Sequence, residues 1–154
     1  SFPTRRSSDL WRFIMIGYGA DELYIKTKAR KLNLHNIEIL PAQDPRIFLE
    51  RASIYMLTSA YEGLPMIVLD AQQFGITTIG FDSFEAIHDI IQDNYNGLII
   101  PNNQIEQYAS KLMWLMDHAE ERVGMALAGL QTCLRFSAET ITDQWERVLM
   151  GCPK

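Results

Sequence analysis

Apolar residues form five short runs in the first two thirds of the chain. Each run is too short for a helix and is apolar on both faces, which is typical of strands buried in a parallel sheet. Helix signals follow four of the runs, so strands and helices alternate, which predicts an α/β fold with a parallel sheet and helices on both faces. The expected strands are 13–17, 37–40, 53–58, 77–81 and 98–100. The expected helices are 21–32, 45–52, 65–74 and 84–92.

From Gln104 onward the apolar residues keep a helical spacing. Ile105, Tyr108, Leu112 and Leu115 recur at intervals of three or four, and the segment 123–134 repeats the pattern. A last helix is expected to begin after Ser137, whose hydroxyl can cap it, and to carry Ile141, Trp145, Val148 and Leu149 on one face. We interpret these stripes as parts of the hydrophobic core.

The strongest candidate for chemistry is the loop that follows the third expected strand. It carries Glu62, Gly63 and Leu64 and enters a helix at Pro65, and a second acid, Asp70, lies in the second turn. Proline is well tolerated at a first helical position, and glycine lets a ligand approach the backbone. Free amides at a helix start attract a phosphate or hydroxyl groups. The pattern therefore predicts a ligand site, although Glu62 as a plain helix-start acid is the alternative.

Two glycines, Gly17 and Gly19, follow the first expected strand. The Gly-x-Gly pattern alone is weak evidence for a nucleotide site, because the third glycine of the dinucleotide motif and an acidic ribose residue on a later strand are both absent. A simple strand-to-helix turn explains the two glycines equally well. The three histidines, His35, His88 and His118, are scattered, and none is expected to act directly in chemistry. His88 is the best candidate of the three for a role near a ligand.

Composition excludes several classes of function. A net charge of −5 provides no basic surface for nucleic acid, so nucleic acid is not an expected partner. Cys133 and Cys152 lack metal-ligand spacing, and no metal site or cofactor is expected. No apolar run is long enough to span a bilayer. We expect a cytoplasmic protein, and the inner face of the membrane is one location at which it could act.

Residues 1–10 differ from the rest of the chain. They are polar, lack periodicity, and resemble one reading frame of a common sequencing adapter. We interpret them as a non-native, adapter-derived segment, with a natural N-terminal arm as the alternative. On that interpretation the credible domain covers residues 11–150, and the sequence upstream of Trp11 is missing.

The Glu62-x7-Asp70 spacing resembles the E-x7-E signature of retaining GT-B glycosyltransferases of family 4, the glycosyl transferases group 1. Other parts of the chain are similar to the same family in the same order, so the resemblance covers residues 11–150. The matching segments are Ile16-Gly17-x-Gly19, Leu34-x-Asn36-Ile37, Ala52-Ser53-Ile54, Leu57-Thr58-Ser59, Phe74-Gly75, Asp89-Ile90-Ile91 and Asn96-Gly97-Leu98.

The resemblance implies a Rossmann-like domain that binds a nucleotide-diphosphate sugar, the C-terminal half of a GT-B fold with its first strand and helix missing. Glu62, as the catalytic residue, and the backbone of Gly63, Leu64 and Pro65 would contact the hexose, and Asp70 would hold the ribose hydroxyls.

Gly17 and Gly19 would lie at the phosphate end of the donor, and Ala42, in the loop 41–43, would border the base. Two residues depart from the family pattern: Asp70 replaces a glutamate, and Pro41 stands where relatives often carry glycine.

The resemblance also implies that an Arg and a Lys that neutralise the diphosphate, and a first domain that binds the acceptor, are missing. We therefore expect a piece of a hexosyltransferase that is inactive by itself. The full-length enzyme would transfer a hexose, with retention, to a saccharide or lipid-linked acceptor in polysaccharide biosynthesis, with peripheral membrane association as one arrangement. In the strand order 3-2-1-4-5-6 the missing strand would lie between 13–17 and 53–58 and leave two strand edges open.

Three alternatives remain open at this point. A GT-B sugar-nucleotide epimerase shares the fold and the donor class. A non-catalytic nucleotide-binding module describes the 154-residue chain equally well. A phospho-acceptor signalling domain is the most distant alternative, because it needs paired acids after the first strand and a lysine after a late one, and the loops 17–20 and 81–83 carry neither.

Overall fold

A computed structural model describes residues 10–151, which divide into two compact units after Glu50. Nearly all of the expected adapter-derived segment, residues 1–9, and Cys152 lie outside the described residues. The two units are considered separately. No helix within residues 10–151 combines the length and the apolar character needed to cross a membrane.

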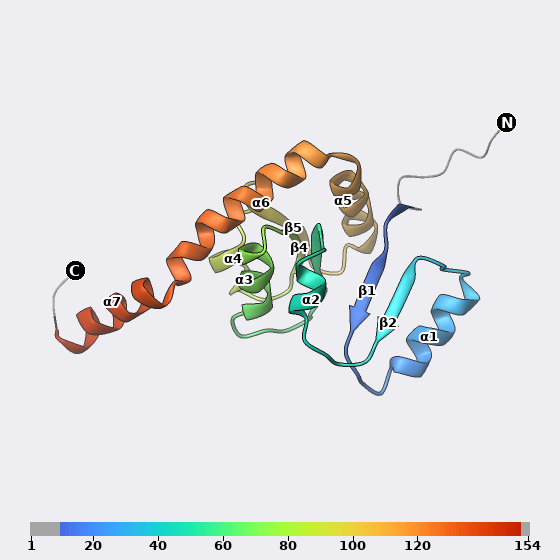
Figure 1. The fold of residues 1–154 in the computed structure, drawn as a ribbon, viewed down its shortest axis with the longest axis horizontal. Helices are drawn as coiled ribbons and strands as arrows, with labels where there is room; N and C mark the ends of the chain where they lie inside the picture. Colours follow the sequence, from blue (N-terminus) through green and yellow to red (C-terminus); the bar gives the residue numbers. More distant parts are fainter. Residues whose placement is uncertain (1–9, 152–154) are drawn as a thin grey trace. The chain divides into compact units, whose positions relative to one another are not determined.

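The first unit contains a two-stranded parallel sheet. Its strands run side by side (Figure 1), with Phe13 opposite Ile37 and Ile16 opposite Leu40. Both strands therefore end at the same edge, where the loops that follow them meet. The elements of this unit are β1 (Phe13–Ile16), α1 (Glu22–Lys31), β2 (Ile37–Leu40) and α2 (Arg46–Leu49).

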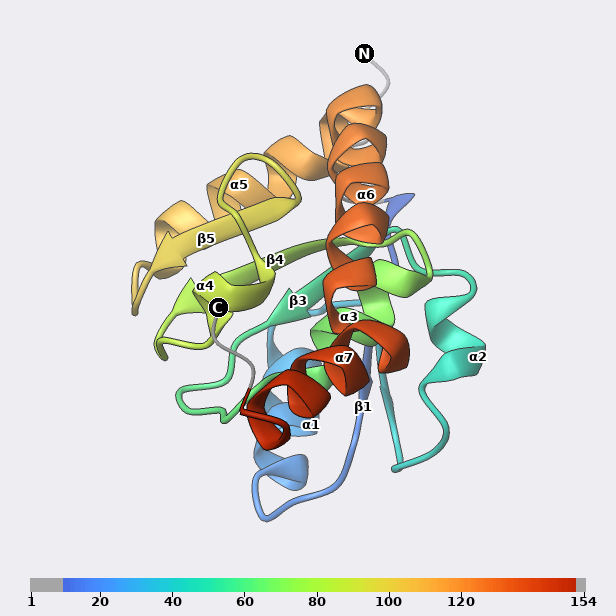
Figure 2. The same cartoon turned by 90° about the vertical axis from the view of Figure 1, so that its left-hand side faces the viewer.

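The second unit is built on a three-stranded parallel sheet in the order β3-β4-β5. Figure 2 shows these strands with α3, α4, α5 and α6 around them. The elements are β3 (Ile54–Leu57), α3 (Met66–Gln73), β4 (Thr77–Asp82), α4 (Ile87–Ile90), β5 (Gly97–Pro101), α5 (Ile105–Asp117), α6 (Ala119–Cys133), the 3₁₀ turn η2 (Leu134–Phe136) and α7 (Ala138–Leu149).

Apolar side chains fill both faces of this sheet. One buried cluster joins the end of β3 to α3 and α4, and the other joins β4 and β5 to α5 and α6. The first contains Leu57, Val68, Leu69, Ile87, Ile90, Ile91 and Cys133. The second contains Ile79, Leu98, Ile100, Tyr108, Leu115 and Met125. The expectation of a parallel sheet with helices on both faces is therefore confirmed in the second unit.

The pairing of the strands differs from a single continuous sheet. In the described residues β1 pairs only with β2, and β3 pairs only with β4, so the five strands form two sheets. The two sheets belong to different units, and the resemblance places an additional strand between the segments 13–17 and 53–58. Apolar runs identify strands but carry no information about their partners, so the expectation of two open strand edges came from the resemblance and not from the runs.

The helix expected over 84–92 is much shorter in the structure, where α4 covers only Ile87–Ile90. Ile91 is already extended, and the side chain of Asn96 binds the backbone on both sides of it. The amide group of Asn96 donates to the carbonyl of Ile90, and its oxygen accepts from the N–H of Gln92. These contacts replace the bonds that a longer helix would form.

The last helix begins as expected. The Ser137 hydroxyl accepts a hydrogen bond from the Thr140 N–H (3.1 Å), which confirms Ser137 as the N-cap of α7. The remaining part of that expectation is wrong, since no residue of α7 is buried and Trp145, Val148 and Leu149 are exposed. In the described chain, the apolar stripe of α7 is therefore not part of the core.

Candidate functional site

Glu62 lies in the loop between β3 and α3, and its side chain is half-buried. The loop leaves the sheet after the buried Leu57 and returns to the core at the buried Pro65. Pro65 was expected at the first helical position, but α3 begins one residue later, at Met66, and Pro65 occupies the N-cap. Glu62 is thus presented close to the start of a helix, as the sequence predicts.

The start of α3 leaves the backbone amide of Ile67 available. The amide of Met66 donates to the carbonyl of Leu64 (2.8 Å), and the amide of Val68 donates to that of Pro65 (2.9 Å). The amide of Ile67 has no acceptor among residues 10–151. An unpaired amide at the positive end of a helix can bind an anion or a hydroxyl oxygen.

Gly63 borders open space. A Cβ atom added at this residue would have no heavy atom within 4 Å, apart from its chain neighbours. The packing of the described chain therefore does not require a glycine here. A ligand that approaches the backbone closely would require one, and the space for it is free.

Asp70 lies in the second turn of α3 and is exposed, whereas the adjacent Leu69 and Ala71 are buried. Within the described part of the chain, neither Asp70 nor Glu62 forms a side-chain hydrogen bond or an ion pair. Both carboxylates are thus available to accept hydrogen bonds from hydroxyl groups.

The charges of the two acids affect nearby buried groups. Burial, and secondarily the Glu62 carboxylate, raises the pKa of the Tyr55 hydroxyl. Burial, and secondarily Asp70, raises the pKa of the Cys133 thiol. Cys133 donates weakly to the carbonyl of Leu69 and is kept in its neutral form, which suits a structural role.

In the first unit the structure brings together the two loops at the edge of its sheet. The amide of Gly17 donates to the carbonyl of Leu40 (3.1 Å), so the turn with Gly17 and Gly19 lies beside the loop with Ala42. Gly17 has a φ of +156°, which side chains rarely adopt, and an added Cβ at either glycine would meet no atom within 4 Å. Ala42 is exposed. Both loops are therefore accessible.

At the end of β4 and in the loop that follows it lie two polar residues that the sequence did not single out, Asp82 and Ser83. Asp82 contacts His88 of α4, the histidine that the sequence did single out. The Nε2 atom of His88 lies 2.9 Å from an oxygen of Asp82, and both side chains are about half exposed. The hydroxyl of Ser83 contacts the loop of Glu62 through the carbonyl of Ser59. The only available signal was their position just beyond the carboxyl end of an expected strand, the edge at which parallel sheets bind ligands.

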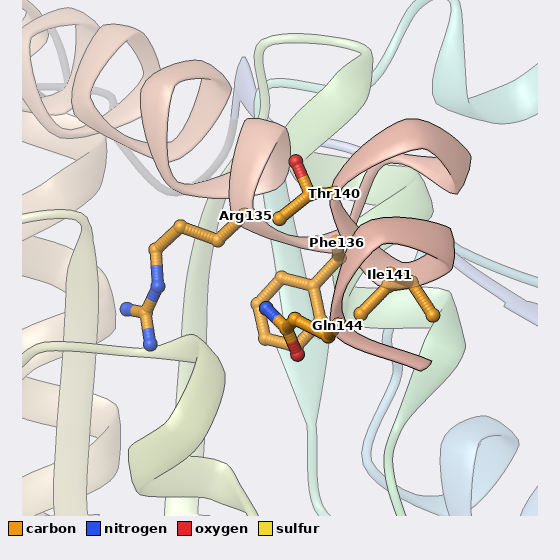
Figure 3. A pocket seen from close by; sticks show the side chains of 5 residues that line it. All are labelled: Arg135, Phe136, Thr140, Ile141 and Gln144. Atoms are coloured by element: carbon orange, nitrogen blue, oxygen red, sulfur yellow. The ribbon is translucent and has the colours of Figure 1, made fainter. Parts of the chain in front are cut away.

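A hollow of about 230 Å³ lies at the junction of η2 and α7 (Figure 3). Phe136 and Ile141 provide its apolar surface, and Arg135, Thr140 and Gln144 surround them. A second hollow of about 370 Å³ extends along α4 and includes His88, Asn96, Thr132 and Arg135. None of the donor-binding residues expected from the sequence lines either hollow, and His88 is the one histidine weighed there that does.

A family model for glycosyl transferases group 1 matches residues 2–131. Among curated proteins, an uncharacterized glycosyltransferase from Haemophilus influenzae is 26% identical over 141 residues, which are 90% of this chain and 40% of that protein. A GalNAc-alpha-(1->4)-GalNAc-alpha-(1->3)-diNAcBac-PP-undecaprenol alpha-1,4-N-acetyl-D-galactosaminyltransferase from Campylobacter jejuni is 22% identical over 139 residues, 90% of this chain and 39% of that protein. The chain thus spans about 40% of the length of these relatives.

Solved structures share the fold. The crystal structure of Anabaena HepE in complex with UDP-glucose is similar to this chain with a TM-score of 0.80 and 14% sequence identity. The similarity covers 91% of this chain and 41% of HepE. The described residues therefore have the Rossmann-like α/β fold of GT-B glycosyltransferases, as the sequence predicts.

Proposed function

This chain belongs to the glycosyl transferases group 1, and we propose that it is the donor-binding part of an enzyme that transfers a hexose from a nucleotide-diphosphate sugar. The transfer would proceed with retention, as in family 4. The acceptor would be a saccharide or a lipid-linked saccharide in polysaccharide biosynthesis. The full-length protein would work in the cytoplasm. If its acceptor is lipid-linked, it would work at the inner face of the membrane.

The observation that carries this proposal is a pair of carboxylates that form no hydrogen bond or ion pair within residues 10–151. Glu62 and Asp70, eight residues apart, flank the start of a helix with an available amide at Ile67 and open space at Gly63. In the proposed arrangement Glu62 and the backbone at 63–65 contact the hexose hydroxyls, and Asp70 accepts hydrogen bonds from the ribose. Carboxylates are strong acceptors for such hydroxyl pairs.

Similar proteins support the donor and acceptor classes. HepE, which shares the fold, has been crystallised with UDP-glucose. The Campylobacter jejuni relative is named for transfer to a saccharide linked to undecaprenol through a diphosphate. The names of the relatives reported above are those of transferases, which favours sugar transfer over the epimerase alternative. The roles expected of Gly17, Gly19 and Ala42 remain predictions.

The proposal assigns donor binding to this chain and other steps of the reaction to the rest of a longer protein. The curated relatives are more than twice the length matched here. We propose that a separate domain binds the acceptor and that cationic residues outside this chain neutralise the departing diphosphate. Stabilisation of a developing charge of this kind commonly contributes several kcal/mol to catalysis. The 154-residue chain would then bind a donor without transferring its sugar.

Binding of nucleotide sugars to the purified 154-residue chain tests the proposal directly. Isothermal titration calorimetry with UDP-glucose, GDP-mannose and ADP-glucose should detect at least one donor, and E62Q should weaken its binding. The matched control is E121Q, which removes an exposed acid on α6. Binding of none of the three, or equal binding by E62Q, would refute the proposed site. Turnover of a nucleotide sugar by this chain would refute its expected inactivity.

A further inference from the structure

The hydroxyl of Ser83 connects the two loops that follow β3 and β4. It donates a hydrogen bond to the carbonyl oxygen of Ser59 across 2.6 Å, between residues 24 positions apart in the chain. Both residues are half-buried. Ser59 lies three residues before Glu62, so the contact acts on the segment that carries the proposed hexose-binding acid.

The loop of Ser83 is firmly anchored to the second unit. The amide of Ser83 donates to the carbonyl of Phe81 (2.9 Å), which closes a tight turn at the end of β4. The next residue, Phe84, packs against the buried cluster around α3, and Ile87 is fully buried in that cluster. Asp82 and His88 add a polar contact of 2.9 Å across the same loop. Ser83 therefore projects from a fixed base.

The loop of Ser59 has much less support. Thr58, Ala60 and Tyr61 are exposed, with 85% of the Tyr61 surface accessible. In the described part of the chain, the bond from Ser83 is the one side-chain hydrogen bond that residues 58–64 form. Between the buried Leu57 and the buried Pro65, it restricts the path of the backbone together with the bond from the Met66 amide to the carbonyl of Leu64.

We propose that Ser83 is a positioning residue for the sugar end of the donor. By holding the carbonyl of Ser59, it fixes the backbone that leads to Glu62 and places the Glu62 carboxylate before the ligand arrives. A group that is ordered in advance loses less conformational entropy on binding, so the hexose is bound more tightly. This inference rests on the proposed function of Glu62.

The comparison of UDP-glucose with UDP isolates this role, because UDP lacks the hexose. The 154-residue chain is titrated with both ligands as wild type and as S83A. Loss of one hydrogen bond should weaken UDP-glucose binding about three- to tenfold. The affinity for UDP should change less than about twofold, because a group that positions only the hexose contact has no share in UDP binding.

Two further variants separate positioning from folding. S83T keeps the hydroxyl and should restore the affinity for UDP-glucose. S83C keeps the size of the side chain but donates weakly, and it should behave like S83A. S110A, on the exposed surface of α5, is the matched control and should bind both ligands like the wild type. Circular dichroism and urea unfolding of each variant compare their folded states.

The outcomes distinguish the two proposals. The positioning role of Ser83 is overturned, and the proposed function stands, in either of two cases. In the first, E62Q weakens UDP-glucose binding but S83A and S83C do not. In the second, S83A and S83C weaken the binding of UDP and of UDP-glucose equally. If the wild type binds none of UDP-glucose, GDP-mannose and ADP-glucose, or if E62Q binds the donor normally, both are overturned. Where GDP-mannose or ADP-glucose is the donor that binds, that donor and its nucleoside diphosphate replace UDP-glucose and UDP in these titrations. Selective loss of UDP-glucose affinity in S83A and S83C, with rescue by S83T, supports the role.

Discussion

The Tyr108 hydroxyl donates a hydrogen bond to the carbonyl oxygen of Ile79 across 2.9 Å, and both residues are buried. The bond ties α5 to the middle of β4, next to the ring of Phe81, whose centroid lies 4.6 Å from that of Tyr108. One face of the sheet is thereby fixed to its helix by a polar contact as well as by apolar packing.

Removing this hydroxyl should destabilise the second unit. We expect Y108F to lower the free energy of unfolding by about 1 kcal/mol, because the ring packing is kept and one buried hydrogen bond is lost. Urea unfolding followed by circular dichroism measures the change. The matched control is Y95F, at an exposed residue in the turn before β5. Equal stability of Y108F and the wild type would show that the bond contributes little.

Alkaline pH should destabilise the protein through buried tyrosines. Burial, and secondarily Tyr55, raises the pKa of Tyr108, and burial, with Glu62 as a second cause, raises that of Tyr55. The unfolded chain therefore loses these protons first, at a pH near 10. The contribution of these tyrosines to stability should be constant below that value and should fall as the pH rises above it. The Cys133 thiol, whose pKa is also raised by burial, adds a fall that begins near the ordinary cysteine pKa of about 8.5.

The measurement for this prediction is the urea midpoint between about pH 8 and 11, the range around the ordinary tyrosine pKa. The double variant Y55F/Y108F should lose less stability over the range than the wild type does, while Y95F should follow the wild type. Identical pH profiles of the double variant and the wild type would contradict the assignment.

Two glycines should respond in opposite directions to alanine. A Cβ at Gly97 would lie 2.6 Å from the carbonyl oxygen of Thr78 and 3.0 Å from a methyl of Ile91. Since a strand backbone cannot move aside easily, G97A should cost about 1–3 kcal/mol. Gly124 lies exposed within α6 with open space around it, so G124A should stabilise the protein by about 0.5–1 kcal/mol.

Thermal and urea unfolding of G97A and G124A against the wild type give both values. The pair controls for the general effect of a methyl group, because the chemical change is the same in both. A stabilised G97A would mean that β5 can shift away from β4 at this point.

The two acids of the proposed site should affect different parts of the donor. E62Q should weaken UDP-glucose binding about tenfold and leave UDP binding unchanged, because a charge-assisted hydrogen bond to the hexose is lost. D70N should weaken both ligands, since both contain the ribose. Calorimetric titration of each variant measures the effects, with E121Q as the control. A selective loss of UDP-glucose affinity in D70N would reverse the assigned roles.

Asp70 offers a further variant for the same titrations. It is one methylene shorter than the glutamate of the family pattern, so D70E should extend the carboxylate toward the ribose and strengthen the binding of UDP and UDP-glucose alike. Weaker binding of both ligands by D70E would indicate that the shorter side chain fits this site.

The sequence by itself determined the local elements of this protein. Each strand in the structure lies within or overlaps an expected apolar run, and the Ser137 cap is where its hydroxyl predicts. The spacing of Glu62 and Asp70 on a loop and a helix was also readable. These features depend on neighbours within a few residues, whose periodicity and backbone preferences appear directly in the order of amino acids.

Only the tertiary structure decided which distant segments meet. The five strands form two sheets, β1-β2 and β3-β4-β5. The amide of Asn96 binds the backbone where α4 ends, and Ser83 binds Ser59. Each of these features depends on contacts between residues that are not neighbours in the chain. Such contacts form when apolar burial and strand pairing bring backbones together. The local sequence around a serine, an asparagine or an apolar run does not identify the distant residue that it will contact.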